Sequence, residues 1–191
     1  MEPRLKQQFM TQWDKYFPGA ELPIAFYYTN DDKWGKQTDK GSGVQCVIEN
    51  IGRVRDGKVL VLDLESTKCG GGKRFLGFSQ ELGPDFEFFL STGIPGKMEG
   101  EHYKKSPALA KEHFSRLPVF EAPGKYLVLK RWDQLEAEDD PAGVIFFARP
   151  DVLSGLFSLA NFDEPGANGV FAPSGAGCST IVYYPCVEAK S

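Results

Sequence analysis

Two kinds of apolar segment alternate along this chain, and their alternation restricts the folds that it can adopt. Short runs rich in β-branched and aromatic residues are typical of buried strands, and they occupy residues 23–28, 59–64, 125–130 and 143–148. Other segments have the apolar spacing or the starting proline of a helix, and they include residues 5–17, 44–54, 107–117 and 150–159. This interleaving predicts a mixed α/β or α+β fold, with helices packed around a mixed sheet.

Length, composition and charge narrow the class of protein. The chain has 191 residues, of which 41% are hydrophobic, and this is enough to build a core. The formal charge of −4 argues against a general nucleic-acid binder, because such proteins normally carry a net positive charge. No apolar run reaches the ~18 residues that a membrane-spanning helix needs. We therefore predict a single domain over residues 1–191 with neither a nucleic-acid nor a membrane partner, and the oligomeric state stays open.

The start of the chain and its cysteines indicate a compartment. The first residues, MEPRLKQQF, are charged and lack the apolar core of a secretion signal. The cysteines Cys46, Cys69, Cys178 and Cys186 are too sparse for a disulfide scaffold and form no Cys-x-x-Cys pair. The sequence therefore predicts a cytoplasmic protein with reduced thiols. Because cysteine is among the most buried residue types, each thiol is also a candidate core residue.

The segment Cys69-Gly70-Gly71-Gly72-Lys73-Arg74 is the most distinctive local pattern. Consecutive glycines let the backbone turn sharply and approach a ligand closely. A helix that begins near Lys73 would direct its free N–H groups and its positive end at this turn, where they can hold an anion and activate a thiol. We therefore predict that these six residues bind a ligand, with Cys69 as the candidate catalytic thiol. The alternative is a simple connection that contains a buried cysteine.

Cys46 and Cys178 also lie where a glycine-containing loop meets an expected helix. Together with Cys69 they would occupy three helix N-termini, and such thiols could converge on one site. Thiolates favour zinc, copper(I) and iron–sulfur clusters. We therefore name four candidate ligands for zinc or an iron–sulfur cluster: Cys46, Cys69, Cys178 and Cys186. The alternative that the sequence leaves open is four separate core cysteines.

Several common catalytic patterns are absent from the sequence. A phosphate-binding P-loop needs glycine at position 67 and serine or threonine at position 74, where the chain has Thr67 and Arg74. The glycines of residues 70–77 do not have the spacing of a dinucleotide-binding loop. His102 and His113 form no zinc-binding pair, and there is no Gly-x-Ser-x-Gly elbow. The sequence therefore favours none of these enzyme classes.

A weak internal repeat relates two parts of the chain. The pattern Ser-Gly-x-x-Cys occurs at residues 42–46 and 174–178, each time after an upstream aromatic strand and before an apolar, helix-compatible run. The pattern suggests two related units, residues 20–90 and 120–191. Because the second unit lacks the strand that follows the helix in the first, we expect that it is truncated.

Three connecting segments carry weaker expectations. Residues 133–142 are acidic and end at Pro141, which predicts a solvated connection with Asp139 and Asp140 exposed. The polar stretch 30–43 is long enough to be a functional loop. Residues 86–90 fit a short strand or a helix equally well.

The chain resembles a known family, that of the domain of unknown function 169, also labelled ArCR. The resemblance runs from about residue 20 to the end, and it is carried by the strand PIAFYY, the helix with Cys46, the turn of Cys69 and its glycines, the strand VIFFARPD, and Cys178. The family implies a mixed α/β fold and no particular reaction. Its members continue beyond the late cysteine, which agrees with the expected truncation.

The sequence leaves three hypotheses for the function. The first is a protein that binds a metal, an iron–sulfur cluster or a small anionic ligand in a pocket of Cys69, Gly70–Gly72 and Cys178, with Cys46 as a further ligand and Lys73 or Arg74 neutralising negative charge. The second is a thiol-dependent enzyme or redox protein that uses Cys69. The third is a structural or interaction protein with buried cysteines. Metal content separates the first from the others, and thiol reactivity separates the second from the third.

Overall fold

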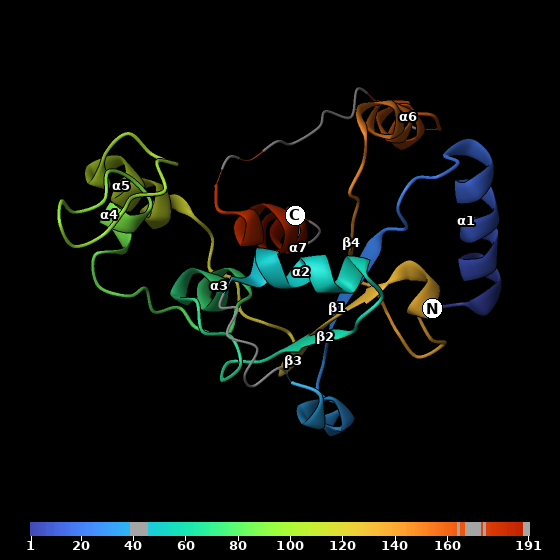
Figure 1. The fold of residues 1–191 in the computed structure, drawn as a ribbon, viewed down its shortest axis with the longest axis horizontal. Coiled ribbons are helices and arrows are strands. Elements are labelled where there is room, and N and C mark those ends of the chain that lie inside the picture. Colours follow the sequence, from blue (N-terminus) through green and yellow to red (C-terminus); the bar gives the residue numbers. More distant parts are fainter. Residues whose placement is uncertain (39–45, 164, 167–172, 174, 189–191) are drawn as a thin grey trace.

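Four short strands form one antiparallel sheet in the order β2-β3-β1-β4 (Figure 1). Their bounds are β1 (Ile24–Thr29), β2 (Leu60–Leu62), β3 (Tyr126–Arg131) and β4 (Gly143–Ile145). The computed structural model describes residues 1–38, 46–163, 165–166, 173 and 175–188. In this part of the chain the α+β class is confirmed, and the sheet is antiparallel throughout rather than mixed.

Helices make up most of the remaining regular structure. The described α-helices are α1 (Pro3–Tyr16), α2 (Val47–Arg55), α3 (Gly70–Phe75), α4 (Phe86–Phe89), α5 (Pro107–Arg116), α6 (Pro150–Ala160) and α7 (Tyr184–Glu188). Three shorter elements are the 3-10 helices η1 (Asp32–Lys36) and η2 (Trp132–Gln134) and the π-helical turn η3 (Ser179–Tyr183). The expected helices are confirmed to within a few residues. Residues 86–90, which fitted either structure, form α4.

The main core lies between one face of the sheet and the helices α2, η3 and α7. Because side chains alternate along a strand, the paired residues Phe26 and Leu129 face this core while their neighbours face the other side. Ile51 of α2 and Val182 of η3 pack into the same cluster, and both are almost completely buried. Figure 1 shows α2 and α7 together on this side of the sheet.

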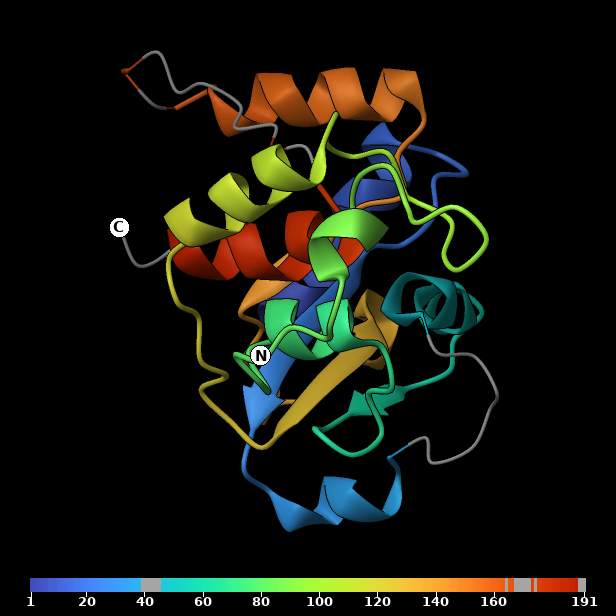
Figure 2. The same ribbon diagram turned by 90° about the vertical axis from the view of Figure 1, so that its left-hand side faces the viewer.

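A smaller core covers the opposite face of the sheet. Trp34 of η1 packs there against Tyr27, Tyr126 and Val128. In Figures 1 and 2, η1 lies across the sheet from α2 and α7. Strands β1 and β3 are therefore buried on both faces, which accounts for their unbroken apolar sequences.

A buried ion pair lies beside this smaller core. Lys130 Nζ donates a hydrogen bond to Asp139 Oδ2 at 2.7 Å, and the two side chains are only 3% and 2% exposed. Tyr27 Oη donates to the other carboxylate oxygen at 2.5 Å, and the Glu136 backbone N–H donates to Oδ2 at 2.8 Å. The expectation of a fully solvated acidic connection is wrong, because Asp139 ties this segment to the sheet.

The fourth strand is shorter than its apolar sequence predicts. The expected strand over residues 143–148 ends at Ile145, and Phe146 and Phe147 are each 38% exposed. The ring of Phe146 stacks on Trp13 of α1 with centroids 5.5 Å apart, and the guanidinium of Arg55 lies 4.4 Å from the centre of the Phe147 ring. These two phenylalanines therefore serve packing outside the sheet.

Parts of some expected features lie outside the described residues. These parts are residues 39–43 of the polar loop, residues 44 and 45 of the second expected helix, and residues 42–45 and 174 of the two repeated motifs. The strands that open the two units, β1 and β4, pair antiparallel with each other. The duplication itself stays a prediction. Within the described ranges, no helix combines the length and the apolar character needed to cross a bilayer.

Candidate functional site

Helix α3 begins directly after Cys69, at the first of the three glycines. Gly70–Gly72 form its first turn, and none of them has a positive φ. The helix thus begins three residues before Lys73, because the glycines form part of it instead of turning the chain before it, and Cys69 lies at a helix N-terminus as expected. Cys69 is the N-cap residue, and its Sγ accepts a hydrogen bond from the Gly72 N–H at 3.4 Å. The thiol thus satisfies one of the N–H groups that a helix start leaves free.

Glycine allows α3 to lie very close to α2. A Cβ atom added to Gly72 would lie 2.9 Å from Cγ2 of Val47 and 3.2 Å from Cγ2 of Thr67. Val47 is the first residue of α2. A Cβ atom on Gly70 would meet nothing within 4 Å. The third glycine is therefore required by the contact between the two helix starts, and the first is not.

Cys46 and Cys178 lie at two other helical elements, Cys46 in extended backbone before its helix and Cys178 with helical backbone in the first turn of its segment. Cys46 is the exposed N-cap residue of α2, and Cys178 is the buried residue that precedes η3. A Cβ atom added to Gly177 would lie 2.7 Å from Cγ1 of Ile48, so the chain before η3 rests on the first turn of α2. The starts of α2, α3 and η3 therefore meet, and they bring Cys46, Cys69 and Cys178 to one region.

The thiols of this region influence one another electrostatically. Burial, followed by the nearby thiols of Cys69 and Cys46, raises the pKa of Cys178 to about 12. Burial also raises the pKa of the Tyr103 phenol, with smaller effects from Glu101, Cys178 and Cys46. Cys178 is therefore a protonated thiol at neutral pH, and Tyr103 lies within range of the same groups.

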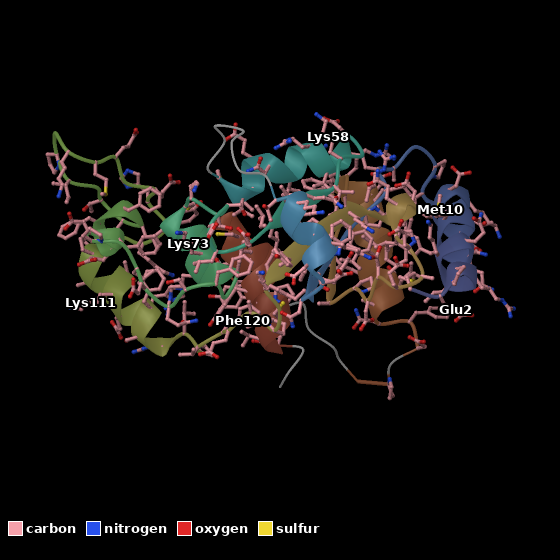
Figure 3. The ribbon with its side chains drawn as sticks, turned by 90° about the horizontal axis from the view of Figure 1, so that it is seen from below. Glu2, Met10, Lys58, Lys73, Lys111 and Phe120 are labelled. Carbon is pink, nitrogen blue, oxygen red and sulfur yellow. The ribbon has the colours of Figure 1, made fainter. Side chains whose placement is uncertain are left out.

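The charged residues of the motif have different surroundings. Lys73, which is labelled in Figure 3, lies one helical turn after Cys69, since its backbone N–H donates to the Cys69 carbonyl at 2.9 Å. Arg74 Nη1 donates to the Gln80 carbonyl at 2.9 Å, and its guanidinium lies 6.0 Å from the centre of the Phe114 ring. The Arg74 side chain is thus already engaged by its own protein.

Cys186 lies apart from the other three cysteines. It is eight positions after Cys178 in the continuous helical segment of η3 and α7, which corresponds to about 12 Å along a helix axis. It is buried in the main core. It also adds to the raised pKa of Tyr28, after the larger effect of burial. The structure therefore brings three of the four candidate ligands together.

The three sulfurs do not already form a metal centre. Among the residues that the structure describes, no group of three or more His, Cys, Asp or Glu side chains is placed so that it could hold a metal ion. One polar group beside the thiols has no partner: Thr67 is 2% exposed, and its hydroxyl makes no hydrogen bond within the described part of the chain. Because a buried hydroxyl without a partner costs about 1–3 kcal/mol, this place favours an additional polar ligand or water.

Sequence reasoning does not find Tyr103 or Thr67. Tyr103 lies in a loop rich in glycine, lysine and proline, where no periodicity shows which side chains turn inward. Thr67 stands two residues before Cys69, and this nearness is the only sequence signal of its place beside the site.

Fold and site together define an α+β protein in which three cysteines lie at the starts of three helical elements. The chain belongs to the DUF169 family, described as uncharacterised ArCR, whose model matches residues 20–191. The resemblance found in the sequence is thereby confirmed over a segment that contains all four cysteines. No curated protein and no solved structure matches the chain.

Two glycines of α3 offer a matched test of the contact between the helix starts. Gly70→Ala is expected to raise the free energy of unfolding by about 0.5–1 kcal/mol, because alanine favours a helix and its methyl group meets open space. Gly72→Ala is expected to lower it by about 1–3 kcal/mol, because the methyl group would crowd Val47. Urea unfolding of the two variants measures the difference. Equal stabilities would show that α3 does not depend on this close contact.

Proposed function

We propose that this protein binds a thiophilic metal ion or an iron–sulfur cluster through Cys46, Cys69 and Cys178. The single observation that carries the proposal is the meeting of three helix starts, with Cys46 and Cys69 as N-cap residues of two of them and Cys178 in the first turn of the third. Thiolates are the protein ligands that soft metals and iron–sulfur clusters prefer. Three such ligands leave one position open for a further group.

Helix N-termini lie beside two of the three thiols, those of Cys46 and Cys69. The positive end of the nine-residue helix α2 stabilises negative charge at its N-cap, and the Gly72 N–H already donates to the Cys69 sulfur. Cys178 opposes this, because its raised pKa keeps it protonated. Metal binding must therefore displace the Cys178 proton and draw the three sulfurs into ligand geometry, with a pH-dependent affinity as the consequence.

Metal content of the protein purified without oxygen tests the proposal. We expect near-stoichiometric zinc or iron, with visible absorption in the case of a cluster, and we expect Cys46→Ser, Cys69→Ser and Cys178→Ser each to lose most of it. Cys186→Ser is the matched control, since Cys186 is a buried cysteine of the same chain that lies apart from the other three. Metal that survives all three substitutions, or protein that neither contains nor takes up zinc or iron, would overturn the proposal.

A second candidate function is supported by the surroundings of Cys69 alone. Its Sγ accepts the Gly72 N–H hydrogen bond and is partly accessible, which are features of reactive thiols. In metal-free protein, a nucleophilic Cys69 would react with an alkylating probe at pH 6 much faster than Cys186. Equal, slow reaction of both thiols until the protein unfolds would instead favour a purely structural role for the cysteines.

A further inference from the structure

A cavity of about 460 Å³ opens at the end of the sheet where β1 and β2 finish and β3 begins. Its walls come from the loop after β2, from the residues after α3 and from the start of β3: Asp63, Leu64, Glu65, Phe78, Lys125 and Tyr126. Figure 2 shows η1 and the loop after β2 at this end of the molecule. Cavities of this size accept small organic molecules. None of the three clustered cysteines lines it.

Aromatic rings and a fixed loop give this cavity a defined shape. Tyr126 is 3% exposed, and Gly35 of η1 lies so close that an added Cβ atom would be 2.6 Å from the tyrosine oxygen. Asp63 and Ser66 hold the neighbouring loop by two reciprocal hydrogen bonds, from Ser66 N–H to Asp63 Oδ1 at 2.7 Å and from Asp63 N–H to Ser66 Oγ at 2.9 Å. The cavity is therefore built by ordered contacts.

The cavity wall carries more acidic than basic side chains. Lys125 Nζ lies 3.1 Å from Asp32 Oδ1 and 5.0 Å from the centre of the Tyr126 ring, so this ammonium already has partners within the protein. Asp63 and Glu65 take part in no ion pair with any described residue. The two carboxylates of Asp63 and Glu65 outnumber the single ammonium of Lys125 in the cavity wall, so the described lining carries net negative charge beside the Phe78 ring. Carboxylates and aromatic faces are the groups that attract an ammonium ion.

We propose that this cavity binds a small organic cation that joins an ammonium group to an apolar body. Asp63 and Glu65 accept the ammonium, while Phe78, Tyr126 and Leu64 contact the apolar part. The site is separate from the thiol cluster, so a test of amine binding and a test of metal binding have independent outcomes.

Calorimetric titration of the full chain with three matched probes tests this proposal. Phenethylamine carries the positive charge, phenethyl alcohol is neutral and hydrocinnamate is negative. We expect saturable binding of phenethylamine at least about tenfold tighter than that of the other two, which corresponds to the contribution of a charged hydrogen bond. Equal affinity for all three probes, or no binding of phenethylamine, would overturn the proposal.

Substitutions then locate the binding site. Glu65→Gln and Asp63→Asn are each expected to weaken phenethylamine binding about tenfold, and Asn at position 63 retains an oxygen for the Ser66 N–H. Glu99→Gln, which neutralises an exposed carboxylate outside the cavity, is the control and should leave the affinity unchanged. Unfolding curves establish that the variants are folded. Binding that both cavity substitutions leave intact would place the amine elsewhere and refute the assignment.

Discussion

Asp139→Asn is expected to lower the free energy of unfolding by about 3–5 kcal/mol. The substitution preserves the shape of the side chain but removes the charge that faces the Lys130 ammonium, which is 3% exposed. Among the described residues, Lys130 then keeps the exposed carboxylate of Glu136 at 3.1 Å and the ring of Trp34, whose centre lies 4.9 Å from Nζ. A buried ammonium without its partner is strongly unfavourable, and this makes the expected effect large. Urea unfolding at neutral pH measures it.

The same ion pair should make stability depend on pH. Burial raises the pKa of Asp139, but hydrogen bonds from Lys130, Tyr27 and the Glu136 backbone outweigh it, and the pKa of the folded protein lies below the ordinary value. A carboxyl group with a lowered folded pKa stabilises the protein above its unfolded pKa. That contribution is lost as the pH falls through the folded pKa. Wild-type stability should therefore decline on the acidic side more steeply than that of Asp139→Asn.

Two further variants distinguish the ion pair from a general effect of the loop. Asp140→Asn changes the exposed neighbour and should alter stability by no more than about 0.5 kcal/mol. Lys130→Met combined with Asp139→Asn should recover part of the loss, because no buried charge remains unpaired. A double variant as unstable as the sum of the two single variants would contradict this account.

Gly77→Ala is expected to lower the free energy of unfolding by about 3 kcal/mol, through two additive causes. Gly77 has a φ of +77°, a conformation that costs other residues about 1–2 kcal/mol. Its added Cβ atom would also lie 2.5 Å from the backbone nitrogen of Ala122, whose N–H donates to the Gly77 carbonyl. Gly77 ends α3 in a Schellman motif, with the Phe78 N–H donating to the Lys73 carbonyl at 2.8 Å. Thermal or urea unfolding measures the loss.

Gly96→Ala separates these two causes. Gly96 has a similar φ of +71°, but a Cβ atom there would meet nothing within 4 Å. It should therefore show only the conformational cost of about 1–2 kcal/mol. If the two variants were equally stable, the close approach of Ala122 to Gly77 would not contribute.

The apolar runs predicted the central strands well because β1 and β3 are buried on both faces. The prediction was wrong beyond Ile145 for a reason outside the run itself. Ile145 pairs with Ile24, the first residue of β1. Pro23 precedes Ile24 and has no N–H group with which to continue the pairing of the two strands. The burial of Asp139 was equally hidden, since it depends on Lys130 of a neighbouring strand.

In the candidate site, too, local sequence patterns predicted the helix starts, whereas features that depend on tertiary contacts were not predicted. The spacing of glycine and cysteine correctly indicated helix starts at Cys46 and Cys69. Sequence did not reveal that the three glycines themselves form the first turn of α3, because glycine favours turns and only the contact of Gly72 with Val47 explains its use in a helix. Cys186 lies away from the other thiols because it is about two helical turns beyond Cys178 in the segment of η3 and α7.

Helix α3 consists of six residues and opens with three glycines, so it has almost no stability of its own. Each glycine costs about 1 kcal/mol relative to alanine, and a helix of this length does not persist in isolation. Cys69 therefore keeps its backbone partner only while α2 and the Gly77 cap hold the segment in place. A ligand that bound Cys69 in this arrangement would also shift the local opening equilibrium of α3, so its affinity and the folding of this segment would be thermodynamically linked.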